Sequence, residues 1–317
     1  MRPILAALAA AALVAGCSSS SSSPANDPTA AAKPRSFAIA GPVGIAVVDS
    51  SVWVVSASAG TVTGFDAATG KKLHTVEVGD TPLRATSDGK QLWVSVFGAG
   101  QVVAVDPASG RITQRVDVPG QPEGIASALG AIWVVRQQAR KLTRIDPDGT
   151  VGTSYPLGSE PRLVTASADR LFVADVTDGT ITRIDPESGE RTVSKPVCDG
   201  AQNLADQDGT LWVTCTRSDT MVAVDEKTLR VTRKLTLKGE PDGIRVANGF
   251  VFVVATTGPT VYTLSADGTG KVEQNVRLGK GGALLDQAND DLSVTDGRVW
   301  VSDYQGNRLI RTGVITG

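Results

Sequence analysis

The sequence predicts an all-β fold, a seven-bladed β-propeller in which each blade is a sheet of four antiparallel strands. Three residue series recur with a period of about 40 residues, and together they carry this prediction. The first is an apolar residue, an aromatic residue and Val, centred on Trp53, Trp93, Trp133, Phe172, Trp212, Phe252 and Trp300. The second is Asp66, Asp106, Asp146, Asp185 and Asp225, continued by Ser265, and the third is Pro42, Pro82, Pro122, Pro161 and Pro241, with Ala201 replacing one proline. Seven aromatic anchors indicate seven blades.

The first 17 residues, 1–17, are expected to be a lipoprotein signal peptide. Arg2 provides a short positive region, and the apolar run from Ile4 to Ala15 is too short to span a bilayer. The run ends in a segment that resembles the lipobox of bacterial lipoproteins, which implies that Cys17 is lipidated. The alternative is an ordinary secretory cleavage with an incidental cysteine. The expected location is therefore the extracytoplasmic face of the cell membrane.

Residues 18–35 are rich in Ser, Pro and Ala, and we expect them to form a flexible linker before a propeller domain at 36–317. Contact with the membrane is expected through the lipid anchor only. A hydrophobic content of 41% is sufficient for a large core, whereas a net charge of −2 provides no basic surface for nucleic acid. We expect a monomer that does not bind nucleic acid.

Export also bears on the other two cysteines. With Cys17 lipidated, Cys198 and Cys215 form an even pair in an oxidising compartment, which favours a disulfide between them. The alternative is two buried thiols, because a cysteine is often only a small apolar core residue.

Within each repeat, Val, Ile and Thr alternate with polar residues, and turn residues follow every eight to twelve positions. The first unit predicts strands near 43–48, 52–56, 61–66 and 72–78. The last unit predicts strands near 292–295, 299–302 and 308–314 and is one strand short. We expect residues 36–41 to supply the missing outer strand, because pairing the two ends closes the ring and leaves no open sheet edge.

The repeated motifs are "P-x-G-I-A", apolar-Trp-Val and "V-x-x-(I/V)-D-P-x-(S/T)-G". Over the mature domain they resemble the seven-bladed propeller superfamily of the YVTN-repeat proteins and the virginiamycin B (streptogramin) lyases. The resemblance implies the fold but does not imply the activity, because one architecture hosts unrelated functions. Streptogramin lyases use a histidine, glutamates and Mg²⁺. The sole histidine of this chain, His74, is expected on an outer strand away from the channel, so a role as an enzyme is uncertain and not favoured.

The repeated residues themselves have a structural explanation. In the Asp-Pro-x-x-Gly turns the Asp carboxylate accepts backbone N–H groups, and Gly70, Gly110, Gly149 and Gly189 supply a positive φ. The turn that begins at Asp146 is one residue shorter than the others, which explains the step of 39 in all three series. The Trp and Phe anchors are expected to pack between neighbouring blades.

Function is expected where the repeats differ. The connections from each outer strand to the next inner strand, and those between the second and third strands, open on one face, and loops on a rigid scaffold often bind partners. We expect this face to bind a protein or small-molecule partner through Arg84, Phe97, Glu123, Arg136, Gln137, Arg162, Asp175, Asn203, Asp242, Asp303 and Tyr304. The enlarged loop at 279–291 lies on the same face. The alternative is that these residues are ordinary solvated loop tips.

A second functional hypothesis is a metal-dependent lyase or lactonase with its site in the central channel. Glu123, Asn203, Asp242 and Asp291 could converge there and supply the oxygen ligands that Ca²⁺ or Mg²⁺ prefers. The related gluconolactonase propellers hold such a metal. The favoured hypothesis is a binding module without cofactor or metal, and a purely structural role in an envelope complex is not separable from it by sequence.

Overall fold

The computed structural model describes residues 34–279 and 290–314. The expected signal peptide, Cys17, the linker up to residue 33 and most of the 279–291 loop lie outside the described residues. The unit that begins at Ala32 contains the whole propeller. No helix in the described ranges is long and apolar enough to cross a membrane.

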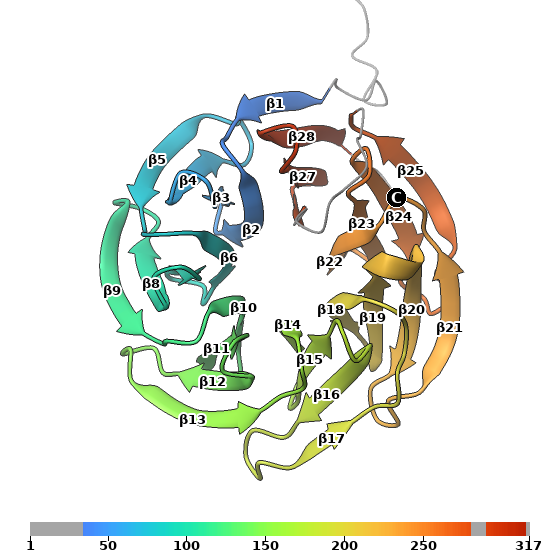
Figure 1. Cartoon of the computed structure of the whole chain (residues 1–317). Helices are drawn as coiled ribbons and strands as arrows, with labels where there is room; N and C mark the ends of the chain where they lie inside the picture. The colour runs from blue at the N-terminus through green and yellow to red at the C-terminus, as the bar shows by residue number, and fades with distance from the viewer. Residues whose placement is uncertain (1–33, 280–289, 315–317) are drawn as a thin grey trace, which may run out of the picture. The chain divides into compact units, whose positions relative to one another are not determined.

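Seven four-stranded antiparallel sheets form a ring around a central channel, and the fold class is as the sequence predicts (Figure 1). Blade 1 consists of β2 (Pro42–Val48), β3 (Ser51–Ser56), β4 (Thr61–Asp66) and β5 (Lys72–Glu77), and blade 2 of β6 (Pro82–Ser87), β7 (Leu92–Val96), β8 (Gln101–Asp106) and β9 (Arg111–Asp117). Blade 3 consists of β10 (Pro122–Ala128), β11 (Ala131–Arg136), β12 (Lys141–Ile145) and β13 (Val151–Pro156), and blade 4 of β14 (Pro161–Ala166), β15 (Leu171–Asp175), β16 (Thr180–Ile184) and β17 (Arg191–Val193). Blade 5 consists of β18 (Ala201–Gln207), β19 (Thr210–Cys215), β20 (Thr220–Asp225) and β21 (Val231–Thr236), and blade 6 of β22 (Pro241–Ala247), β23 (Phe250–Ala255), β24 (Thr260–Ser265) and β25 (Val272–Arg277). Blade 7 combines β26 (Leu292–Thr295), β27 (Arg298–Asp303) and β28 (Arg308–Val314) with β1 (Arg35–Ala38).

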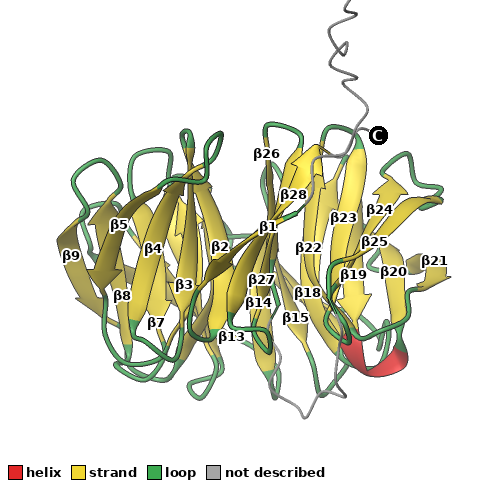
Figure 2. Cartoon of the chain, turned by 90° about the horizontal axis from the view of Figure 1, so that it is seen from above, coloured by secondary structure: helices red, strands yellow, loops and turns green. Residues whose placement is uncertain are grey.

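The two faces of the ring are distinguished by their connections (Figure 2). We call the loop face the one that carries the connections between second and third strands and between successive blades. It includes the 3₁₀ helix η1 (Thr216–Ser218), drawn red in Figure 2. The opposite face, called the hairpin face, carries the turns between first and second and between third and fourth strands.

The ring closes as predicted, because β1 pairs antiparallel with β28 as the outer strand of blade 7. Arg35 lies opposite Arg311 and Phe37 lies opposite Leu309, so the strand begins one residue before the expected domain boundary. The Phe37 ring lies 5.7 Å from the ring of Trp300 and contributes to the core between blades 7 and 1.

The core lies between the blades. Among the described residues, seven clusters of buried side chains each combine residues of two neighbouring blades. Trp53, for example, packs with Leu92 and Val94 of the next blade and has no exposed surface. The packing role expected for the Trp and Phe anchors is therefore confirmed. His74 stacks on Trp53, with ring centroids 6.4 Å apart, at the outer side of blade 1.

The Asp turns hold the hairpin face together as expected. Oδ1 of Asp66 accepts the hydroxyl of Thr69 at 2.6 Å and the backbone N–H of Thr69 at 2.7 Å, and these two hydrogen bonds lower the pKa of Asp66. In the shortened turn the acceptor shifts, because the N–H of Thr150 donates to Asp148 while Asp146 accepts from Arg144. Gly70, Gly110, Gly149 and Gly189 all have positive φ.

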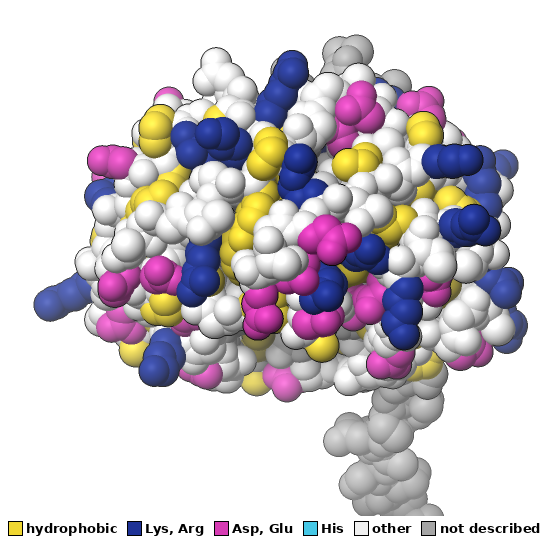
Figure 3. All heavy atoms as spheres, turned by 90° about the horizontal axis from the view of Figure 1, so that it is seen from below, with side chains coloured by type: hydrophobic (Ala, Val, Ile, Leu, Met, Phe, Trp, Pro, Cys, Tyr) yellow, Lys and Arg dark blue, Asp and Glu magenta, His cyan; other side chains and the backbone are white. Residues whose placement is uncertain are grey.

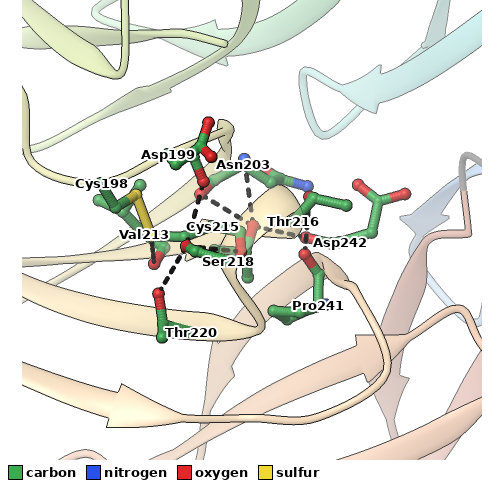
Figure 4. The surroundings of a disulfide bond; sticks show 11 residues. Cys198, Asp199, Asn203, Val213, Cys215, Thr216, Ser218, Thr220, Pro241 and Asp242 are labelled. Carbon is green, nitrogen blue, oxygen red and sulfur yellow. Dashed lines mark hydrogen bonds between the residues drawn. A yellow bond between two sulfur atoms is a disulfide. The ribbon is translucent and has the colours of Figure 1, made fainter. Parts of the chain in front are cut away.

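The disulfide between Cys198 and Cys215 is confirmed, with Cα atoms 6.0 Å apart, and the two-thiol alternative is wrong (Figure 4). It connects the end of β19 to the connection that precedes β18. The bond therefore fixes a loop-face connection to the blade that follows it.

The outer rim offers no large apolar surface in the view of Figure 3, where basic and acidic side chains alternate and hydrophobic ones are scattered. The exposed large hydrophobic residues on outer strands occur singly, as Leu73, Val151, Val193, Val231 and Val272. Single exposed apolar residues are ordinary on protein surfaces.

Candidate functional site

The channel is narrow where the inner strands begin, next to the loop face. A Cβ atom on Gly44 would lie 2.7 Å from the carbonyl oxygen of Leu83, and one on Gly243 would lie 2.8 Å from Cα of Asp291. A Cβ atom on Gly124 would lie closer still, 2.3 Å from the carbonyl oxygen of Arg162. Because only glycine permits such an approach, neighbouring inner strands touch backbone to backbone at this level.

Five of the sequence-derived residues meet at this constriction, and we call them the charged cluster: Arg84, Glu123, Arg162, Asp242 and Asp291. The side chain of Glu123 is 2% exposed and lies 3.1 Å from Nη2 of Arg162. Asp291 lies 3.8 Å from Nη1 of Arg84. Buried charges persist in proteins when they are paired, as the carboxylates of Glu123 and Asp291 are.

Asp291 is held by backbone as well as by cations. Its Oδ2 accepts the N–H of Ile45 and Nη2 of Arg245, both at 3.1 Å, and its Oδ1 accepts the N–H of Leu292 at 2.8 Å. Arg245 was not among the residues predicted from the sequence. The sequence nevertheless marks Arg245 as unusual, because a large charged residue replaces a small one at this position of the repeat. The equivalent residues of the first five blades are Ala46, Thr86, Ala126, Thr165 and Ala205.

Asp242 has the most unusual environment of the cluster. Burial, opposed by the positive charge of Arg84, raises the pKa of its carboxyl to about 7. Neither of its carboxyl oxygens accepts a hydrogen bond from a described residue. Figure 4 shows its strand connected by hydrogen bonds to the neighbourhood of the disulfide, where Thr216 donates to the carbonyl oxygen of Pro241 at 2.8 Å. Burial also raises the pKa of the neighbouring Asp290 well above its usual value.

The remaining predicted residues lie apart from the cluster. Asn203 is buried at the channel wall, and its side-chain oxygen accepts the N–H of Leu204. Asp175 and Asp303 are buried and brace their own loops, accepting N–H groups from Asp178 and Gly306 respectively. Their carboxylates are therefore engaged in loop structure.

Phe97, Arg136, Gln137 and Tyr304 remain on the loop face, half-buried. Phe97 lines a groove of about 380 Å³, whose other walls are 98–100, 119–121 and Gln138. Nε of Arg136 donates to the carbonyl oxygen of Pro119 at 2.7 Å and so fixes one wall. The N–H of Tyr304 donates to Asp290, which connects its loop to the constriction.

The metal-site hypothesis meets a physical difficulty in this arrangement. Glu123 and Asp291, two of the four proposed ligands, already face guanidinium groups, and a divalent cation would have to displace or repel these arginines. Within the described ranges, no group of three or more His, Cys, Asp or Glu residues is arranged to hold a metal ion.

A larger cavity of about 520 Å³ occupies the channel on the hairpin-face side of the cluster. It extends from Arg84 and Asp291 to the turn residues Leu129 and Ala168. Binding was predicted on the opposite face, because that prediction compared only the loops and the first residues of the inner strands.

Comparison with known proteins places this architecture in a recognisable class. A family model described as "Outer membrane protein assembly factor BamB" matches residues 36–192, just under half of the chain. No curated protein sequence matches. Among solved structures, a streptogramin B lyase is 17% identical over 89% of this chain and 97% of its own, with a TM-score of 0.76.

Virginiamycin B lyase from Staphylococcus aureus is 18% identical over 89% of this chain and 99% of its own, with a TM-score of 0.75. BamB from Moraxella catarrhalis is 17% identical over 85% of this chain and 84% of its own, with a TM-score of 0.59. The chain is a seven-bladed β-propeller, and the resemblance to the virginiamycin B lyase type inferred from its motifs is confirmed at the level of the fold. Sequence identities this low establish the fold only, so the activity has to be argued from the residues of the site.

Proposed function

We propose that this protein is a lipid-anchored extracytoplasmic binding module that takes a protein partner through its loop face. The observation that carries the proposal is the groove beside Phe97, which three connections of blades 2 and 3 build together. An aromatic side chain in a groove on a rigid scaffold is a favourable anchor point for a partner.

The backbone around the groove adopts a regular conformation. Gln121, on one wall, has φ of 60°, and Thr81, whose carbonyl oxygen accepts the N–H of Phe97, has φ of 51°. The equivalent positions Gly41 and Glu240 have φ of 52° and 59° and accept the corresponding N–H groups, so this conformation belongs to the repeat. It fixes the shape of the groove walls.

The family match lends further support, because residues 36–192 include the two blades that form the groove. The matched family is described as an assembly factor, which is a role based on contact with other proteins. The lyase or lactonase alternative has no comparable support, since His74 lies at the outer side of blade 1 and two of the carboxylates proposed as ligands face arginines.

The test is capture of partners by the full-length chain after cross-linking in membranes. Phe97→Ala should abolish capture without lowering the melting temperature by more than a few degrees. Leu73→Ala is the matched control, because it removes an exposed apolar side chain from an outer strand. Capture that survives Phe97→Ala but is lost in Leu129→Ala would place the partner on the hairpin face and refute the proposal.

The anchor is tested separately. Cys17→Ser should move the protein from the membrane fraction to the soluble fraction, since lipidation is the expected membrane contact. A wild-type protein that carries no lipid and is freely secreted would contradict this part of the proposal.

A further inference from the structure

The outer edge of blade 5 carries positive charge that the proposed function does not use. We call this surface the basic edge, and it consists of Lys227, Arg230, Arg233, Lys234 and Lys238, all of them exposed. Two of these residues lie on β21, the others flank it, and no acidic residue lies between 227 and 238. Acidic and basic side chains alternate over much of the surface in Figure 3, but Lys and Arg gather at its right edge, on the side of the ring where Figure 1 places β21.

The basic edge distinguishes blade 5 from the other repeats. In the corresponding segments of blades 1 to 4 and 6, the outer strand and its flanking residues contain at most two Lys or Arg, and each segment also contains an acidic residue. These segments are 68–79, 107–119, 147–158, 187–195 and 268–279. Charged residues can protect an unpaired sheet edge from aggregation. Edge protection alone does not explain the difference, because β13 is also an outer strand and none of its residues is charged.

The positive charge of the basic edge is only partly offset by neighbouring groups. Within residues 34–279 and 290–314, no ion pair includes any of its five cations. Asp225 and Asp267 lie within the electrostatic influence of Lys227 and Arg233 respectively. Both carboxylates accept hydrogen bonds from the turns in which they lie. The cations themselves therefore face solvent.

The shape of the basic edge suits an extended anionic surface. From Arg230 to Lys238 the chain advances eight residues, which corresponds to roughly 25 Å at the rise of a β-strand. Arg233 and Lys234 are consecutive in β21, so their side chains point to opposite sides of this edge strand. Small ligands prefer concave sites, whereas these charges are spread along the outer rim of the ring (Figure 1). A flat anionic surface can meet several of them at once.

We propose that the basic edge binds the anionic lipid headgroups of the membrane to which the protein is anchored. The inference rests on the proposed location at the membrane and adds a second contact to the lipid anchor. Each Lys or Arg near an anionic bilayer increases the binding constant about fivefold. An anchor keeps the domain close to the bilayer, so a contact that is weak by itself becomes effective.

This contact is compatible with a partner on the loop face. In Figure 1, β21 lies on the side of the ring opposite β9 of blade 2. The groove beside Phe97 belongs to blades 2 and 3, so a bilayer against β21 leaves this groove accessible.

The probe is a pair of vesicle preparations, phosphatidylcholine alone and phosphatidylcholine with about one-third phosphatidylglycerol, floated with the full-length Cys17→Ser chain. This chain carries no lipid, and its apolar residues 4–15 meet both kinds of vesicle alike, so the measure is the difference between the two. The chain should float more with the anionic vesicles, and high salt should abolish the difference, because salt screens exposed charges. Equal flotation with both kinds overturns the proposal.

Two double variants of this chain locate the contact. Arg233→Gln/Lys234→Gln should weaken binding to the anionic vesicles roughly tenfold or more. Lys71→Gln/Lys72→Gln is the matched control, because it removes the same charge from exposed positions at the outer strand of blade 1, and its binding should be nearly unchanged. An equal loss in both variants would show that net charge is responsible and would refute the basic edge. Binding to polyglutamate without binding to vesicles would assign the edge to an acidic protein, which also overturns the proposal.

The inference and the proposed function fail independently. A high-salt wash of cell membranes should release the Cys17→Ser chain and retain the lipidated wild type, which separates the basic edge from the anchor. Arg233→Gln/Lys234→Gln should leave partner capture by the anchored chain unchanged. Phe97→Ala should leave flotation unchanged, and flotation lost in Phe97→Ala would place the lipid contact on the loop face and refute the assignment to blade 5.

Discussion

Asp242 is the residue whose surroundings differ most from those of an ordinary carboxylate. It is 1% exposed, and its carboxyl lies within the electrostatic influence of two arginines and two acidic groups. Desolvation outweighs the attraction of Arg84 and Arg162, because a buried ion loses its hydration on every side. The pKa of Asp242, about 7, is therefore set mainly by its burial.

The pH dependence of stability should reveal this proton. The pKa of Asp242 in the folded protein, about 7, lies above its ordinary value of 3.8, so its contribution to stability is full below pH 3.8 and is lost as pH rises through 7. Relative to Asp242→Asn, the wild type should therefore lose unfolding free energy between pH 4 and pH 8. The measurement is urea unfolding of both proteins across this range. A difference between them that stays constant with pH would show that Asp242 has an ordinary pKa.

Single residues also show what sequence can and cannot predict. The carboxylates of Glu123, Asp242 and Asp291 were placed at the channel because they break a repeating position. The ion pairs of Glu123 and Asp291 with arginines were not predicted, since they depend on which side chains the ring brings together. Asp303 was assigned to binding although its carboxylate, 2.7 Å from Nε of Arg308, braces its own loop.

Among the elements, the shortened turn after β12 illustrates how the repeat tolerates a deletion. The missing residue could be located from the sequence, but not the partner of Asp146, whose carboxylate accepts Nε–H of Arg144 whereas that of Asp66 accepts from Thr69. Oxygen acceptors two or three residues from a donor are interchangeable in turns, so the period alone does not identify the acceptor.

Removal of the disulfide should be costly for blade 5. The bond joins residues 17 apart, and in the chain-entropy model closure of such a loop stabilises the fold by about 3 kcal/mol. Cys198→Ser/Cys215→Ser is expected to lower the unfolding free energy by this amount, measured by denaturant unfolding. Wild-type protein reduced before unfolding is the control. Equal stability of the oxidised wild type and the double variant would contradict the expectation.

At the scale of the whole molecule, the ring and its closure were predictable because three residue series share one period and the last unit lacks a strand. The constriction of the channel was not predictable, although the glycines Gly44, Gly124 and Gly243 recur at one position of the repeat. Glycine at a strand start has several explanations, and only the three-dimensional approach of neighbouring backbones selects one.

Deletion of residues 36–41 should destabilise the entire propeller, because blade 7 loses β1 and an open sheet edge replaces a paired one. Deletion of 18–33 should leave the melting temperature almost unchanged. Calorimetric melting of the two truncated chains beside the intact one makes the comparison. Identical melting temperatures for all three would refute the role of β1 in closure.

The pairing of β1 with β28 also sets an order of events in time. The N–H of Gly41 donates to the side chain of Asn307, 266 residues further along the chain. Strand β1 therefore forms its sheet hydrogen bonds only after β28 has been synthesised. Closure of so long a loop is slow, because its entropic cost precedes the contacts that compensate it. Until then the chain has two unpaired sheet edges, and a second copy of the chain could pair with them, so the speed of closure governs how much of the newly made protein aggregates.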